Sequence, residues 1–205
     1  LSGGDFDRVF RIEEHLLTLT LWSPEIADRV WLGIQGEQGW YGFDVFPNVT
    51  AQRARIMARK RFESSLQLDA WYQAARYSEV EHRSGTWGAQ ARGTFFDTLD
   101  AAAGYAREDV VENFLTLADD VQRDVFRLDL GARVTRRIRA DAWGAWVRVN
   151  DGNDGRRGGA TGSFEILQYP RILKLIYSAE YWDYDQNNRT YFSPNGYVQH
   201  GPALH

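Results

Sequence analysis

Residues 124–149 constrain the fold more than any other stretch of the chain, because their pattern is typical of one long β-hairpin. In the first half, apolar residues such as Leu128 and Leu130 alternate with polar residues such as Arg127. Side chains of a β-strand point alternately to its two faces, so this segment predicts one apolar face and one polar face. A turn near residues 136–137 leads into a returning strand with the same alternation.

The length of these two strands points to a membrane. Each has roughly ten residues, which is long for a soluble sheet and is the length that a tilted strand needs to cross a bilayer. The sequence contains no run of about 18 apolar residues, so helical membrane spans are excluded. A mean hydropathy of -0.49 still permits a transmembrane β-barrel, because every second residue of such a barrel can face a polar interior.

Aromatic residues are unusually frequent, with 8 Trp, 10 Tyr and 11 Phe among 205 residues. Tyr and Trp concentrate where one end of the ring is in an apolar environment and the other in water, as at a membrane interface. By composition alone, a Trp-rich soluble β protein has nearly equal weight. Cysteine is absent, which excludes disulfide frameworks, thiol chemistry and zinc sites built on cysteine. The first residues do not resemble a secretory signal peptide, so we expect a mature or excerpted chain.

The rest of the chain repeats the alternation and predicts about eleven strands in one domain that covers residues 1–205. Links between the predicted strands alternate in length. Short links are expected near residues 23–28, 63–64, 97–98, 136–137 and 169–170, and longer ones near residues 43–50, 78–85, 107–121, 150–158 and 185–196. Small turns at one end and large loops at the other are typical of an outer-membrane up-and-down barrel. A soluble up-and-down barrel or a β-sandwich is the alternative.

Residues 51–62 are ambiguous. As a strand, they place Arg53, Arg55 and Arg59 on one face; as a helix, their Ala, Arg and Met content is equally acceptable. The strand is favoured, because strands are predicted on both sides of the segment.

The predicted strands share an apolar face, with aromatic residues near the strand ends. These aromatic residues are Trp40, Tyr72, Trp87, Tyr105, Trp146 and Tyr181. The opposite face is polar and is the candidate lining of a water-filled lumen. The residues predicted to line this substrate path are Arg53, Arg55, Arg59, Asp69, Arg92, Arg127, Asp129, Arg133, Arg139, Asp141, Lys174, Glu180, Trp31, Trp71 and Trp143.

Two interpretations of this polar face stay open. The charges would set the local field of a lumen, and the three tryptophans would offer stacking surfaces for sugar rings. Alternatively, the Arg and Asp side chains only pair with one another across strands. Exposure to bulk solvent would explain the same charges, so the preference for a lumen depends on strand length and on the alternation of links.

No catalytic site is predicted, and the chain is not expected to be an enzyme. His15, His82, His200 and His205 show no spacing suited to a metal site or a catalytic triad. The segment 151–155 superficially resembles a calcium-binding loop but lacks the distal glutamate, so a flexible turn is preferred. We therefore expect no metal, no cofactor and no nucleic-acid partner.

The segment Tyr191-Phe-Ser-Pro-Asn-Gly-Tyr197 follows a strand that ends in Tyr-Trp-Asp-Tyr-Asp and a polar loop. In this setting it resembles part of the C-terminal barrels of bacterial exopolysaccharide export proteins, such as the cellulose, poly-N-acetylglucosamine and Pel export subunits. In these proteins a periplasmic tetratricopeptide scaffold precedes an outer-membrane pore. The resemblance covers roughly residues 60–205 as a pattern. It implies a barrel of about sixteen strands, of which this chain is expected to be a part.

The resemblance implies a pore in the bacterial outer membrane that exports a polysaccharide through a polar, charged lumen. Its expected partners are the lipid bilayer, the polysaccharide, and periplasmic and inner-membrane synthase components. Two alternatives stay open: an outer-membrane porin or channel of another family for small solutes, and a soluble β-barrel or β-sandwich that binds a ligand. The balance of charges does not identify the polymer.

Overall fold

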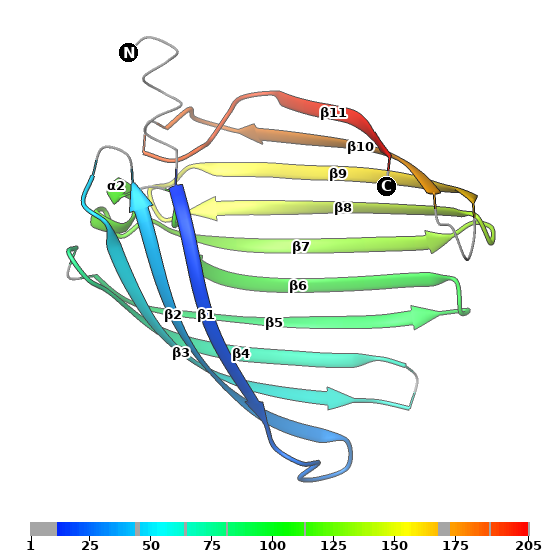
Figure 1. Cartoon of the computed structure of the whole chain (residues 1–205), viewed down its shortest axis with the longest axis horizontal. Coiled ribbons are helices and arrows are strands. Elements are labelled where there is room, and N and C mark those ends of the chain that lie inside the picture. The colour runs from blue at the N-terminus through cyan, green and yellow to red at the C-terminus, as the bar shows by residue number, and fades with distance from the viewer. Residues whose placement is uncertain are drawn as a thin grey trace.

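The computed structural model describes residues 12–43, 46–63, 65–80, 82–112, 114–167, 173–188 and 190–204. These residues form one antiparallel sheet of eleven strands whose spatial order is the order in the sequence (Figure 1). The strands are β1 (Ile12–Trp22), β2 (Val30–Phe43), β3 (Val49–Arg61), β4 (Gln67–Tyr77), β5 (Arg83–Phe95), β6 (Leu99–Asp109), β7 (Gln122–Arg133), β8 (Ile138–Val149), β9 (Asp154–Leu167), β10 (Leu173–Tyr184) and β11 (Tyr197–Leu204). The predicted all-β up-and-down arrangement is confirmed, and β3 shows that residues 51–61 are a strand.

The predicted hairpin of residues 124–149 is the pair β7 and β8. Its register runs without a shift from Arg123 opposite Val149 to Arg133 opposite Arg139. At the connecting turn, the hydroxyl of Thr135 accepts hydrogen bonds from the backbone N–H groups of Arg137 and Ile138. Side-chain acceptors of this kind are common in turns, because they replace the partners that the backbone loses where the ladder ends.

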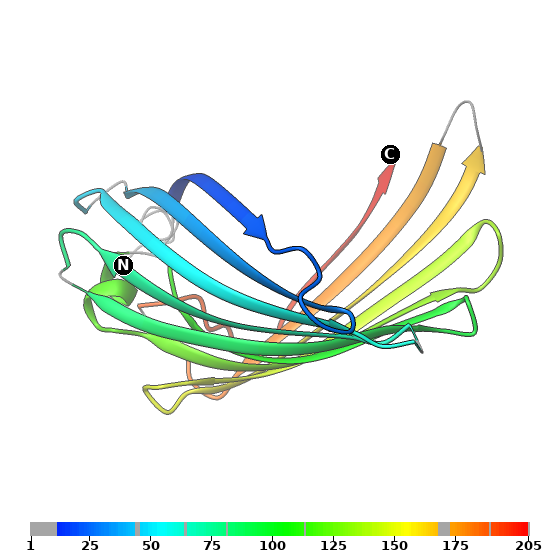
Figure 2. The ribbon, with the colours of Figure 1, turned by 90° about the horizontal axis from the view of Figure 1, so that it is seen from below.

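The sheet curls into a trough and does not close (Figure 2). Within the described residues, β1 pairs only with β2, and β11 pairs only with β10. A continuous meander with two free edges and strong curvature is a partial barrel, as the family resemblance implied. No helix among the described residues is long and apolar enough to span a membrane.

The convex face of the trough is apolar and open. Leu128 and Leu130 of β7 are 49% and 44% exposed, and Ile56 of β3 is 62% exposed. No second sheet packs on this face in the described part of the chain, because all eleven strands belong to one sheet. A β-sandwich, one of the alternatives raised by the sequence, is therefore not what the chain forms.

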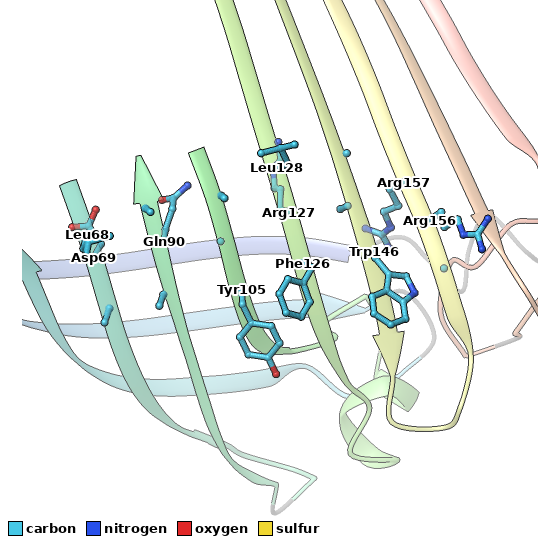
Figure 3. Close-up of a pocket in the computed structure, with 18 of the residues that line it drawn as sticks. Leu68, Asp69, Gln90, Tyr105, Phe126, Arg127, Leu128, Trp146, Arg156 and Arg157 are labelled. Carbon is cyan, nitrogen blue, oxygen red and sulfur yellow. The ribbon is translucent and has the colours of Figure 1, made fainter. Parts of the chain in front are cut away.

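An aromatic row marks one border of this apolar face. Tyr105, Phe126 and Trp146 face one another across β6, β7 and β8 (Figure 3). The ring centroids of Tyr105 and Phe126 are 4.9 Å apart, and the hydroxyl of Tyr105 donates a 2.7 Å hydrogen bond to Asp124. Asp124 belongs to a charged row on the same face, and Arg148 lies opposite it in the register. Rings between an apolar band and charges are typical of the aromatic girdle of a membrane barrel.

Small side chains fill the middle of the convex face. They form the floor of an open groove of 1360 Å³, whose lining also includes the three rings of the aromatic row (Figure 3). Its small lining residues on this face are Ala58, Ala70, Ala89, Ala91, Ala103 and Gly144. The six aromatic residues predicted near strand ends all lie on this face, and Trp40, Tyr72, Trp87, Trp146 and Tyr181 are between 44% and 50% exposed.

The links differ from the prediction in several places. The prediction of a loop over residues 150–158 is wrong, because β9 already begins at Asp154. Gly155 and Arg157 pair with residues of β10 in the sheet. The loop 107–121 begins later than predicted and contains the short helix α2 (Phe114–Ala118). Only the links 110–121 and 185–196 are clearly longer than the rest, so the alternation of lengths is weaker than the sequence indicated. The turn predicted at residues 169–170 lies outside the described residues.

The two longest links cover one end of the concave face. Phe114 of α2 stacks on Phe46, with ring centroids 5.3 Å apart, and lies edge-on to Phe43 of β2. Leu117 is buried with Tyr41, Val49 and Tyr77 of the neighbouring strands in the same hydrophobic cluster. A second cluster places Val121 and Tyr191 against β8 and β10. Among the residues that the structure describes, both buried hydrophobic clusters therefore lie at one end of the trough.

Candidate functional site

All fifteen residues predicted to line a substrate path lie on the concave face. They share this face because they occupy alternate positions of regular strands whose register keeps like faces together. On β3, for example, Arg53, Arg55 and Arg59 lie on the face that also carries Tyr41 and Tyr77, against which α2 packs. The structure thus places the predicted residues on one continuous surface along the trough.

Six of the fifteen residues meet in one pocket near the short-turn ends of β5 to β9. This pocket has a volume of 560 Å³ and also contains polar side chains such as Gln67, Thr94 and Thr161. The six predicted residues in its lining are Arg92, Arg127, Asp129, Arg139, Asp141 and Trp143. Charged groups of both signs and hydroxyl groups are suited to hydrogen bonding with a hydroxyl-rich ligand.

Most of the acidic residues on this face are paired with arginine. The carboxylate of Asp69 on β4 accepts hydrogen bonds from Nε of Arg59 at 2.6 Å and from Nη2 of Arg92 at 2.8 Å. This carboxylate therefore links β3, β4 and β5. Arg127 pairs with Asp129 at 2.7 Å along its own strand. These contacts agree with the alternative in which the charges satisfy one another, and they also hold the guanidinium groups in fixed positions.

Arg139 forms ion pairs with aspartates on two different strands. Its guanidinium lies 2.7 Å from Asp141 on the same strand and 3.3 Å from Asp100 on β6. Gly131 of β7 leaves the space for this arrangement, because a Cβ there would come within 2.6 Å of both Arg139 and Asp141. A side chain at position 131 would therefore displace the ion pair from the pocket.

The predicted tryptophans lie beneath arginine side chains. The guanidinium of Arg127 is 4.5 Å from the ring centroid of Trp143, and that of Arg55 is 4.7 Å from the ring of Trp71. The guanidinium of Arg61 is 5.4 Å from the ring of Trp31. Such contacts are favourable cation–π pairs. They also cover part of the indole surface that a sugar ring would need for stacking.

The remaining predicted residues lie toward the margins of the face. Arg53 forms a short ion pair with Glu37, and both side chains are nearly buried, at 12% and 14% exposure. Lys174 pairs with Glu165 at 3.2 Å across β9 and β10. Arg133 is exposed at the end of β7, and Glu180 lies in β10.

Several residues of this face were missed by sequence reasoning. Trp22 lies under Arg59 at 4.6 Å, and Trp182 lies under Arg157 at 4.5 Å. Alternation along β1 and β10 already placed both tryptophans on the polar face, so this pattern could have identified them. Arg157 was missed because its segment was assigned to a loop. Glu37 and Asp100 could be identified as ion-pair partners only from the register of neighbouring strands.

The Tyr191–Tyr197 segment that carried the family resemblance closes one end of the trough. The ring of Tyr191 is buried, and its hydroxyl donates to Asp151 at 2.9 Å and accepts from Asn153 at 2.9 Å. Asn188 also donates to Asp151 at 2.8 Å, and its backbone N–H donates to Ser193. The segment that resembled a calcium loop therefore fixes the link 185–196. Among the described residues, no group of three or more His, Asp or Glu side chains is arranged to hold a metal ion.

Comparison with known proteins identifies the fold. No family model and no curated protein matches the sequence. A solved structure described as a bacterial polysaccharide outer membrane secretin aligns with a TM-score of 0.75 at 16% identity, over 93% of this chain and 63% of that chain. OmpT, an outer membrane protein of Vibrio cholerae, aligns with a TM-score of 0.40 at 12% identity, over 88% of this chain and 59% of that chain.

Only the first likeness identifies the fold, and this chain spans 63% of the length of that neighbour. Together with the open meander and the apolar convex face, it confirms the predicted fold. The chain has the fold of a bacterial outer-membrane β-barrel and forms part of such a barrel.

Proposed function

We propose that the protein is an outer-membrane pore that exports a polysaccharide along its concave face. The observation that supports this most directly is the placement of all fifteen predicted path residues on that face, opposite an exposed apolar surface. The neighbour described as a polysaccharide secretin shares the fold and so favours the same role. An apolar outside and a charged inside are the arrangement that a water-filled membrane barrel requires.

The proposed polymer contacts are polar groups held in place by ion pairs. The pocket of Arg92, Arg127 and Asp141 presents donors and acceptors near the short-turn ends. Sugar hydroxyl groups can replace water at such positions without leaving buried polar groups unpaired. In this proposal the polymer enters at the short-turn end and leaves beside the links 110–121 and 185–196, because outer-membrane barrels carry their longer loops outside the cell.

A channel measurement tests this function. The full-length protein is inserted into planar lipid bilayers, and polysaccharides of graded length are added on either side. An export pore should conduct ions and should be blocked for a time that lengthens with polymer length. Conduction that is never interrupted by any polysaccharide would instead identify a porin for small solutes. A protein that stays in solution without detergent would contradict both roles, because the convex face would then have another partner.

The proposal includes an upstream periplasmic scaffold and inner-membrane synthase components, as the family resemblance implies. A test of this part is the sequence that precedes Leu1 in the full-length protein. Helical repeats with a period of about 34 residues would support the export family. An upstream region without such repeats would favour an outer-membrane channel of another family.

A further inference from the structure

Four arginines of the concave face form no direct ion pair among the described residues. In the described part of the chain, no carboxylate lies within ion-pair distance of their guanidinium groups. These arginines are Arg55, Arg61, Arg133 and Arg157. Most acidic residues of the same face are already paired with other arginines or with Lys174. These four guanidinium groups are therefore not neutralised by direct contact with a carboxylate of the described residues.

Arg55 is held in place by uncharged neighbours. Its guanidinium lies over the ring of Trp71, and its Nε and Nη2 donate to the amide oxygen of Gln73 at 3.1 and 2.7 Å. Trp71 can lie against the sheet because its neighbour on β5 is Gly88, where a Cβ would come within 2.8 Å of the indole. Three residues thus position one guanidinium without reducing its charge.

Arg157 repeats this arrangement on the other side of the trough. Its guanidinium lies over Trp182 at 4.5 Å, and its Nε donates to the hydroxyl of Tyr184 at 2.8 Å. Gly155 makes room for the ring of Tyr184, since a Cβ there would come within 2.5 Å of two ring atoms. A guanidinium has five N–H donors, so both arginines keep donors for a ligand.

The four arginines are spread along the length of the trough. Arg61 and Arg133 are the last residues of β3 and β7, beside short turns. Arg55 lies midway along β3, and Arg157 lies near the start of β9 at the opposite end of the sheet. A polymer moving along the face would therefore meet unneutralised guanidinium groups both where it enters and further along.

We infer that the polymer carried by this face is an acidic polysaccharide, whose carboxylate or other anionic substituents bind Arg55 and Arg157. This inference rests on the proposed function and assigns its substrate class. A neutral polymer would need only hydrogen bonds to the ion-paired residues and would not require the unpaired arginines. A polymer of cationic amino sugars would be repelled by the four unpaired arginines. Planar guanidinium groups fixed on aromatic rings are well suited to bind carboxylates with two parallel hydrogen bonds.

Two measurements on the full-length protein test the inference. The first is binding of oligogalacturonate in detergent, compared with a maltooligosaccharide of equal length. The second is the reversal potential in a planar bilayer under a KCl gradient. We expect preferential binding of the acidic oligomer that weakens as KCl is raised, and selectivity for chloride over potassium. The double variant R55Q/R157Q should bind oligogalacturonate at least about tenfold more weakly, which corresponds to the loss of one or two charge-assisted contacts.

The matched control is R76Q/R83Q, which removes two exposed arginines from the opposite face at the ends of β4 and β5. This variant has the same net charge as R55Q/R157Q and should bind oligogalacturonate as the parent does. Far-ultraviolet circular dichroism confirms that each variant is folded. Equal binding of the acidic and neutral oligomers, or equal losses in the two variants, would overturn the inference.

The outcomes also separate this inference from the proposed function. Specific binding of oligogalacturonate without any conductance would support the acidic ligand and contradict export. Conductance that is blocked by maltooligosaccharide and not by oligogalacturonate would support export and contradict the acidic substrate.

Discussion

The hydroxyl of Tyr191 donates a 2.9 Å hydrogen bond to Asp151, across a sequence separation of 40 residues. This contact joins the link between β10 and β11 to the turn between β8 and β9. Because the Tyr191 ring is only 2% exposed, the contact is protected from water. The two links therefore form one ordered cap over one end of the trough.

Removing the hydroxyl should loosen this cap. In Y191F the buried ring is kept, but Asn153 and Asp151 each lose one of their hydrogen bonds, which should cost about 1–3 kcal/mol of local stability. Hydrogen exchange of residues 185–196 should become faster, while exchange in β5 stays unchanged. T190S, which keeps its hydroxyl, serves as the control. Equal exchange in Y191F and the parent would show that ring burial alone holds the link.

The same contact should make the cap sensitive to alkaline pH. Burial, the largest cause, raises the pKa of Tyr191 above its ordinary value, and the nearby Asp151 raises it further. The folded cap therefore favours the neutral phenol more than the unfolded chain does. Its stabilising contribution is complete below about pH 10 and is lost as pH rises above that value. Protection of residues 185–196 against exchange, relative to the intrinsic amide rate at each pH, should fall above about pH 10 in the parent but much less in Y191F.

A charge on the convex face should be costly. In L128R, a guanidinium replaces a 49% exposed leucine in the middle of the apolar band. Near the middle of a bilayer, arginine destabilises such barrels by about 2–4 kcal/mol. Unfolding by urea in lipid vesicles should show this loss. Q90R, which adds the same charge on the concave face, should change stability far less. Equal effects of L128R and Q90R would argue against a lipid-facing convex surface.

The buried ion pair of Arg53 and Glu37 should be strongly coupled. Each side chain is at most 14% exposed, so removing either partner leaves a charge with little access to water. R53Q and E37Q should each lower the free energy of unfolding by about 3–5 kcal/mol, whereas the double variant should lose less than their sum. The exposed pair of Arg127 and Asp129 offers the comparison. A double-mutant cycle on this pair should give a coupling free energy below about 1 kcal/mol.

A methyl group at Gly159 should disturb the stack of Trp143 and Arg127. A Cβ at this position would come within 2.5 Å of the indole nitrogen, so the ring has to move. G159A should lower stability by about 1–3 kcal/mol and shift the tryptophan fluorescence. G162A on the same strand is the control, because nothing lies within 4 Å of the added Cβ. An unchanged spectrum in G159A would mean that Trp143 does not rest against β9.

The sequence alone determined the strands and the two faces. The alternation of residues such as Arg127 and Leu128 specifies a face at every position, because a strand has a strict period of two. It therefore placed all fifteen predicted path residues on one side, and the aromatic residues near strand ends on the other. Strand bounds failed at residues 154–158, where glycine and arginine suggested a loop. There, Gly155 is needed for close packing of Tyr184 and not for a turn.

Only the tertiary structure decided which face is concave and which charges are neutralised. Curvature arises from the twist of the whole sheet, and no local pattern encodes its direction. Whether an arginine meets a carboxylate depends on which strands are neighbours and on their register. Arg59 is opposite Asp69, whereas Arg55 is opposite Gln73. For this reason the sequence could list the charges of the face, but the structure was needed to find the arginines that remain unpaired.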